Sequence, residues 1–528
     1  MKELSNQTFV TPWRAFQVNA AWQKREARCK QRIERRLRRR NGPAQLEPMF
    51  RGGNIQYEGS DRVRGLGAGG IGAIHLMVQR LGLAAAIDAN LRLLQVHQPY
   101  HESDHVLHVA YNILCGGKTL EDLDQLRHDE VYQDALGARV VPDPTTAGDF
   151  TRRFRESDIE SLMNAIDAVR VKVWQQQPDS FFDEAIVEAD GTLAPTQGEC
   201  KEGMDISYNG VWGYHPLVVT LANTGEPLYL VNRSGNRPSH EGSAERFDQA
   251  IALCETAGFR KTLLRGDADF SSTRHLDRWN AKNVRFVFGI DAMPKLVELA
   301  TGLSQHAWKR LQRPAKCAVK TEERGRPENI KEQVVAERGF RNIRLESEDV
   351  AEFRYQPGAC RQPYRVVVVR KNLSVAKGEY VLFDDLRYFF YITNDASTPA
   401  DEIVLLANDR CNQENLIEQL KNGVHAMRMP VNTTVSNGAY MVMASLAWTL
   451  KAWFALLLPE TGRCREQRAA EKRTVLRMEF RTFQRSFIAM PCQIVRTGRR
   501  IIYRLLAWNP WQRVFLRGVE SLRSPLRC

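Results

Sequence analysis

The chain has 528 residues, 43% of them hydrophobic, and a formal net charge of +13. This length predicts two to four domains, or one domain with large insertions, and the composition is that of a globular protein with a sizeable core. Ten cysteines form no CxxC pair and no zinc-like spacing with histidine, which argues against a disulfide framework or a zinc ribbon.

The charge is unevenly distributed along the chain. Residues 1–50 carry 12 Lys/Arg against 4 Asp/Glu, and residues 459–528 carry 16 against 5, so the middle is mildly acidic. Basic ends on an acidic body favour a polyanionic partner, with nucleic acid as the leading candidate. The alternative is a charge excess that only improves solubility.

The first 180 residues divide into two predicted parts. Residues 1–60 contain the run KREARCKQRIERRLRRRNG, which predicts a basic N-terminal arm, either an amphipathic helix or a segment that orders on DNA. Residues 61–180 show apolar spacing of three to four and predict an α-helical, DNA-binding domain. Arg152, Arg153 and Arg155 follow PDPTTAGDF, where Thr145 or Thr146 would cap a helix. This segment is either a helix-turn-helix-like reader or part of a plain helical bundle.

From residue 181 the pattern changes to alternating strands and helices. Three strands, a helix, a strand, a helix and a strand predict a mixed α/β catalytic core over 181–293 and 388–458. Between these parts, residues 294–387 carry many charges and runs such as YRVVVVRK, which predict a mainly β insertion. Residues 459–528 predict a basic helical C-terminal tail, which either packs on the core or contacts DNA.

Two segments bear on membranes and export. The N-terminus, MKELSNQTFVTPW, lacks the apolar core of a signal peptide, and a cytoplasmic location is expected. Residues 439–458 are apolar over about the length of a membrane span, but they contain Ser445, Thr449 and Lys451. A buried helix is therefore favoured over a membrane span.

Three acidic residues stand out by their position. Asp190 ends the first strand of the α/β unit, and Asp267 or Asp269 ends the fourth. Glu414 lies on a helix after the insertion. Carboxylates at the carboxyl ends of strands, together with one on a facing helix, can converge in a crevice.

Residues 408–421 supply the helix that carries Glu414. At about 100° per residue, Arg410, Glu414 and Lys421 fall within roughly 40° of one another on one face. Such a face is often only solvated charge. Beside converged carboxylates, however, Arg410 and Lys421 would hold DNA phosphates.

Hard carboxylate oxygens are the ligands that Mg²⁺ prefers. Two Mg²⁺ ions about 4 Å apart activate an oxygen nucleophile and stabilise the leaving oxygen in phosphodiester displacement. Asp190, Glu414 and one of Asp267 and Asp269 are therefore predicted as catalytic residues and metal ligands, with Mn²⁺ as an alternative to Mg²⁺.

The chain resembles bacterial insertion-sequence transposases of the DDE class (transposase DDE domain, group 1), which have a ribonuclease-H-like core with a β-rich insertion. EADGT matches the segment of that family's first acid, and RGDADF matches its Arg-x-Asp-x-x-Phe segment, which selects Asp267 over Asp269. Arg410, Glu414 and Lys421 match the spacing of its Tyr-Arg-Glu-Lys signature. The family's Tyr falls at Ala407, where this chain departs from the pattern.

The resemblance implies cut-and-paste transposition of an insertion sequence. The enzyme would bind inverted-repeat ends, cleave DNA by metal-dependent hydrolysis and join the 3′-hydroxyl to target DNA, as a homodimer or larger synaptic complex. A Trp of the insertion assists a hairpin step in some relatives, and Trp308 lies in the insertion here. The alternatives are a structure-specific nuclease of the same fold and a non-enzymatic, transposon-derived DNA-binding protein.

Overall fold

The structure is a computed structural model that describes residues 20–38, 55–59, 63–313, 330–377, 380–462, 464–498 and 500–523. Much of the predicted N-terminal arm lies outside these residues. Its described part is mainly the basic helix α1 (Ala20–Arg38). The described residues 20–38 of this segment are thus helical, and residues 39–42 of the basic run lie outside the described residues.

Apart from the two-residue strand β1, the regular elements of residues 63–174 are helices. A Gly82 residue in the left-handed conformation separates the first two helices, which bend by 58° relative to each other. The seven helices are α2 (Ile71–Leu81), α3 (Leu83–Asn90), α4 (Glu102–Leu114), α5 (Leu123–Arg127), α6 (Glu130–Leu136), α7 (Pro144–Thr151) and α8 (Glu156–Trp174). The cap of α7 is Asp143 rather than Thr145 or Thr146, because its carboxylate accepts hydrogen bonds from the Thr146 amide and hydroxyl.

The core sheet contains five strands in the order β7–β6–β2–β8–β9. The strands β2, β6 and β7 are antiparallel, and β8 and β9 continue parallel to β2. This is the strand order 3-2-1-4-5 of a ribonuclease-H-like core, and the predicted sequence of strands and helices is confirmed. The elements are β2 (Ala185–Gly191), β6 (Leu217–Leu221), β7 (Glu226–Val231), α9 (Ser243–Ala257), β8 (Thr262–Gly266), α10 (Leu276–Ala281) and β9 (Arg285–Ile290). A small side sheet contains β3 (Ala194–Pro195), β4 (Asp205–Ile206) and β5 (Trp212–Tyr214).

The insertion extends this sheet instead of forming a separate one. Its long hairpins join the core through β13, where Phe390 to Thr393 pair with Ile290 to Val287 of β9. The predicted insertion strand YVLFDD and core strand YFFYITND are thus one continuous strand, because no turn residue separates them. The elements are α11 (Pro294–Thr301), β10 (Lys309–Arg310), α12 (Ile330–Glu337), β11 (Arg341–Tyr355), β12 (Tyr364–Lys377) and β13 (Tyr380–Thr393).

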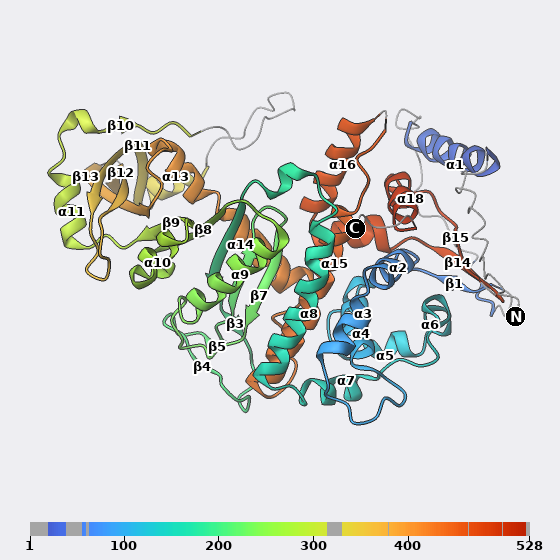
Figure 1. Ribbon diagram of the computed structural model, residues 1–528. Helices are drawn as coiled ribbons and strands as arrows, with labels where there is room; N and C mark the ends of the chain where they lie inside the picture. Colours follow the sequence, from blue (N-terminus) through green and yellow to red (C-terminus); the bar gives the residue numbers. More distant parts are fainter. Residues whose placement is uncertain are drawn as a thin grey trace, which may run out of the picture.

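The chain then returns to the core through α13 (Ala400–Asn408), α14 (Cys411–Glu418), a π-helical turn (Gln419–Gly423) and α15 (Thr434–Leu456). Helix α15 is long and apolar enough to cross a membrane by length and composition, but its most apolar stretch is entirely buried inside the protein. The predicted buried helix is therefore confirmed. In Figure 1, α15 lies beside α8 between the core sheet and the N-terminal helices.

The tail contains helices and a hairpin. Helices α16 (Arg465–Arg477), α17 (Phe480–Phe483) and α18 (Gln512–Ser521) fit the prediction, whereas the hairpin of β14 (Cys492–Thr497) and β15 (Arg500–Leu505) was not predicted. Strand β14 pairs with β1 (Gly65–Leu66), so the two ends of the fold meet (Figure 1). Helix α1 lies beside α18, where Arg513 Nε donates to Glu26 at 2.9 Å.

Glu226 joins the sheet to the two long helices. Its buried carboxylate, at the start of β7, accepts hydrogen bonds from the side chains of Arg170, Trp174 and Trp453. Because a buried carboxylate without partners is strongly destabilising, this set of bonds specifies how α8 and α15 pack on β7.

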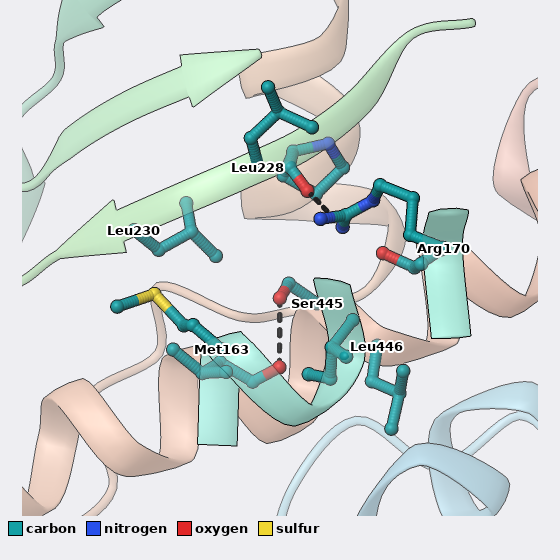
Figure 2. Close-up of a pocket in the computed structure, with 10 residues that line it drawn as sticks. Met163, Arg170, Leu228, Leu230, Ser445 and Leu446 are labelled. Atoms are coloured by element: carbon teal, nitrogen blue, oxygen red, sulfur yellow. Dashed lines mark hydrogen bonds between the residues drawn. The ribbon is translucent and has the colours of Figure 1, made fainter. Parts of the chain in front are cut away.

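Figure 2 shows a cavity between these same elements, lined by Met163, Arg170, Leu228, Leu230, Ser445 and Leu446 among others. Its volume is about 10 Å³, enough for roughly one water molecule. It is a packing gap in the core and too small for a substrate.

Candidate active site

Two predicted acids lie together at one edge of the core sheet. Asp190 is the penultimate residue of β2, and Asp267 directly follows β8, which pairs parallel to β2. The exposed fractions of their side chains are 18% and 37%. The carboxyl ends of neighbouring parallel strands meet at one edge, and this topology brings together residues 77 positions apart.

A guanidinium group lies between these two carboxylates. Arg410 Nη1 is 3.4 Å from an oxygen of Asp190 and 3.1 Å from an oxygen of Asp267. Asp269, the alternative from sequence, is exposed and instead donates its backbone amide to Asp267. Of these two acids, only Asp267 forms an ion pair with Arg410 in the described structure.

The electrostatics of the edge favour a bound cation. The pKa of Asp190 is raised to about 7: burial raises it most, Arg410 opposes the shift, and the negative charges of Asp267 and Glu414 add to it. Burial also raises the pKa of Asp267, again opposed by Arg410. Carboxylates with raised pKa values gain from any cation that neutralises their repulsion.

Glu414 lies in the first turn of α14 with its side chain exposed. The neighbouring Gln413 is buried and donates to the Val218 carbonyl at 3.3 Å. Val218 is the β6 residue that pairs with Asp190, so this bond docks α14 beside the first acid. Within the described ranges, the three acids are not among the groups whose donor atoms all lie within 4.8 Å.

The predicted single helix over 408–421 is interrupted. Arg410 precedes α14 as its cap residue, and the chain widens into the π-helical turn after Glu418. Lys421 lies in this turn and is half-buried. Burial lowers its pKa, while the charges of Glu418 and Asp190 raise it, which places the ammonium group within electrostatic reach of the first acid.

A buried ion pair that the sequence analysis missed supports the site. Arg265 of β8 donates through Nε to Glu188 of β2 at 2.7 Å, and the two residues are register partners. Arg265 Nη1 also donates to the Leu406 carbonyl in α13 at 2.6 Å. The pair is two residues before Asp190 and Asp267, so it joins both acid-bearing strands and the helix that leads to Arg410.

Ala407 and Trp308, two residues noted in the family comparison of the sequence, lie in different parts of the structure. Ala407 is buried in an apolar cluster against which Tyr391 of β13 packs, and Asn408 forms a hydrogen bond with the Tyr391 hydroxyl. Tyr391 thus lies beside Asn408, one residue after the position of the family's Tyr. Trp308 lies in the insertion, 4.3 Å from the guanidinium of Arg370, measured from its ring centroid.

A family model for the transposase DDE domain, group 1, matches residues 65–526. The chain belongs to this family. The match includes all three acids, the insertion and most of the tail of this DDE transposase. Transposases of this class generally use divalent metal ions.

No match was found among curated proteins. Among solved structures, the DDE transposase is similar to a cryo-EM structure of the piggyBac transposase synaptic complex with hairpin DNA. The sequence identity is 10%, the TM-score is 0.33, and the alignment covers 79% of this chain and 80% of the other. The assignment to the family rests on the family match.

The residues at the sheet edge fit a divalent cation. They offer hard carboxylate oxygens, and the Arg410 guanidinium occupies the place between Asp190 and Asp267 as a cation would. Asp190, Asp267 and Glu414 would hold the metal, after Arg410 withdraws from the two aspartates.

We expect Asp190→Asn to stabilise the metal-free protein in a pH-dependent way. Because the pKa of Asp190 is raised from 3.8 to about 7, folding takes up a proton between these values. The wild type therefore loses about 1.4 kcal/mol relative to the variant for each pH unit in this window as pH rises. Urea denaturation in chelator at pH 4 to 8 should give a gap that widens up to about pH 7. A pH-independent gap would contradict the raised pKa.

We expect Arg265→Lys to weaken metal-dependent activity while the protein still folds. Lysine keeps the charge but cannot bond Glu188 and Leu406 in the same fixed geometry. Disturbing groups that orient metal ligands typically costs about 10–100-fold in metal affinity or activity. The measurement is the Mn²⁺ concentration for half-maximal DNA cleavage. Arg278→Lys, which alters the surface pair with Asp248, is the control. An unchanged Mn²⁺ dependence in Arg265→Lys would remove the positioning role.

Proposed function

We propose that this protein catalyses cut-and-paste transposition of a bacterial insertion sequence. The observation that supports this function best is the pair Asp190 and Asp267 at one sheet edge, with Glu414 docked beside them by α14. Its substrates would be the inverted-repeat ends of the element and a target DNA, in the cytoplasm at the nucleoid. The working form would be a homodimer or larger synaptic complex.

The chemistry has two phosphodiester steps. Water attacks the phosphorus at the element end, and the bond to the 3′-oxygen breaks to leave a 3′-hydroxyl and a 5′-phosphate. That 3′-hydroxyl then attacks a target phosphodiester, which releases a 3′-hydroxyl from the target strand. Two Mg²⁺ ions, when bound, supply nucleophile activation and charge neutralisation.

The side chains around the site divide the remaining tasks. Asp190, Asp267 and Glu414 would hold the metal ions, and Arg410 would leave the two aspartates and turn its guanidinium to a DNA phosphate. Lys421, half-buried beside Asp190, contributes a second cation for the phosphate backbone.

The basic ends would grip the DNA outside the cleavage site. Helix α1 and the tail elements α16 and α18 lie near one another on one side of the molecule (Figure 1). Exposed cations on these elements include Arg25, Arg28, Arg35, Arg36, Arg473, Arg477 and Arg513. Such a surface binds DNA phosphates with little dependence on base sequence.

We expect Glu414→Gln to lower the rates of cleavage and joining by about 100-fold or more, because a neutral amide is a poor ligand for Mg²⁺. The assay uses a supercoiled plasmid that carries the cognate element ends, with products resolved as nicked, excised and joined DNA. Glu418→Gln, one turn further along the same helix, is the matched control and should remain active.

The product pattern separates the alternatives. Wild-type levels of joined product from Glu414→Gln would remove Glu414 from the metal site. Nicks without joining by the wild type would favour a nuclease, and binding without any divalent-metal cleavage would favour a non-enzymatic DNA-binding protein.

We expect Arg28→Ala with Arg35→Ala to weaken DNA binding across all sequences. Each phosphate contact adds roughly 0.9 to the slope of log K against log salt, so the double variant should lower the slope by about 2. Fluorescence anisotropy at several salt concentrations measures it. Lys172→Ala with Lys261→Ala is the control; these two lysines are exposed and lie in α8 and directly before β8, outside α1 and the tail. Equal slopes for both double variants would show that α1 does not contact the phosphates.

A further inference from the structure

The N-terminal helical domain contains a second group of potential metal ligands. His97, His101 and Glu102 lie where the loop after α3 enters α4, and one donor atom from each lies within 4.8 Å of the others. Among the residues that the structure describes, no other group of three or more His, Cys, Asp or Glu side chains has its donor atoms this close together. It belongs to a different part of the fold from the acids at the sheet edge.

The carboxylate of this group is held in a fixed position. The Glu102 side chain is 1% exposed, and its Oε1 accepts hydrogen bonds from the backbone amides of Leu93 and Leu94 at 2.9 and 3.0 Å. Burial alone would raise its pKa, but these amides and the nearby His97 lower the pKa. The two amide bonds therefore hold the carboxylate in one orientation, with Oε2 directed at His97 Nε2, 3.0 Å away.

The two imidazoles form the open side of the group. The rings of His97 and His101 stack with centroids 4.3 Å apart and planes 16° from parallel, and both side chains are exposed. Neither ring is buried, so small rotations about their side-chain torsions can change the separation of their nitrogens. The group thus combines one fixed oxygen with two adjustable nitrogens.

This donor set has a clear chemical preference. Imidazole nitrogen with one carboxylate suits Zn²⁺ and neighbouring transition metals, whereas Mg²⁺ favours sites built from oxygen. Bonds of about 2.0–2.2 Å in a tetrahedral site require donor separations of roughly 3.4 Å. The 3.0 Å contact and the 4.8 Å limit lie on either side of that distance.

We propose that His97, His101 and Glu102 bind one Zn²⁺ ion, with a water molecule in the fourth position. Zn²⁺ would bind Nε2 of neutral His97, whose proton is then on Nδ1, so the contact between His97 Nε2 and Glu102 Oε2 would give way to bonds from both atoms to the ion, and a proton displaced from Nε2 would pass to solvent. No bond to carbon forms or breaks, and the Glu102 carboxylate would offset one of the two positive charges of the ion.

The ion would fasten the loop at residues 91–101 to the first turn of α4. This loop already contacts another part of the helical domain, since the Tyr100 hydroxyl donates to the Val141 carbonyl at 3.0 Å. A metal at the loop end would therefore stabilise the helical domain and have no part in the phosphodiester chemistry.

The test compares metal binding by the full-length wild type and by His97→Gln with His101→Gln. After dialysis against Zn²⁺, elemental analysis should find about one more equivalent of zinc in the wild type. Co²⁺ substitution should add tetrahedral visible absorption bands in the wild type that the double variant lacks. Zn²⁺ should also raise the thermal midpoint of the wild type more than that of the double variant.

One control and one replacement variant keep these outcomes interpretable. His128→Gln alters an exposed histidine of the same domain and should bind as the wild type does. If the double variant does not fold, His97→Gln alone replaces it, because His97 lies in the exposed loop. Equal zinc content in the wild type and the folded variant, or Co²⁺ spectra that do not differ between them, would overturn the proposal and leave only a hydrogen bond between His97 and Glu102.

Discussion

The buried ion pair between Glu188 and Arg265 is the interaction on which the candidate active site depends. Strand side chains repeat every two residues, so Glu188 and Asp190 share one face of β2, and Arg265 and Asp267 share one side of the chain at β8. Burying two charges is costly unless each is fully bonded, and the bond from Arg265 to Leu406 adds the third partner. The pair therefore fixes the two strands and α13 relative to one another.

The charges at the sheet edge follow from this arrangement. Once β2, β8 and α13 are fixed, the chain after α13 brings Arg410 between Asp190 and Asp267, and the Gln413 bond to Val218 docks Glu414 beside them. The insertion lies between these segments in sequence, yet it lengthens the same sheet through β13 instead of displacing them. Under the proposed function, a divalent ion and a DNA phosphate would together replace the ion pairs between Arg410 and the two aspartates.

Much of this core could be predicted from the sequence, because the periodicities of strands and helices are local patterns. Acidic residues at the ends of predicted strands can also be identified directly in the sequence. EADGT and RGDADF also carry Glu188 and Arg265 two positions before their acids, so the period of a strand would have placed them beside the site. Their pairing depends on parallel register, which is not local. The β14–β15 hairpin was missed because alternating Arg and aliphatic residues fit either an amphipathic helix or a strand, and only pairing with β1 decides between them.

The most direct measurement of the central claim is anomalous diffraction from crystals of the protein grown with Mn²⁺ and DNA of a cleaved element end. We expect manganese peaks bonded to carboxylate oxygens of Asp190, Asp267 and Glu414, with Arg410 turned from the aspartates to a phosphate. Manganese bound to none of these three acids, or an Arg410 that still joins Asp190 to Asp267 in the DNA complex, would contradict the assignment of the sheet edge as the catalytic site.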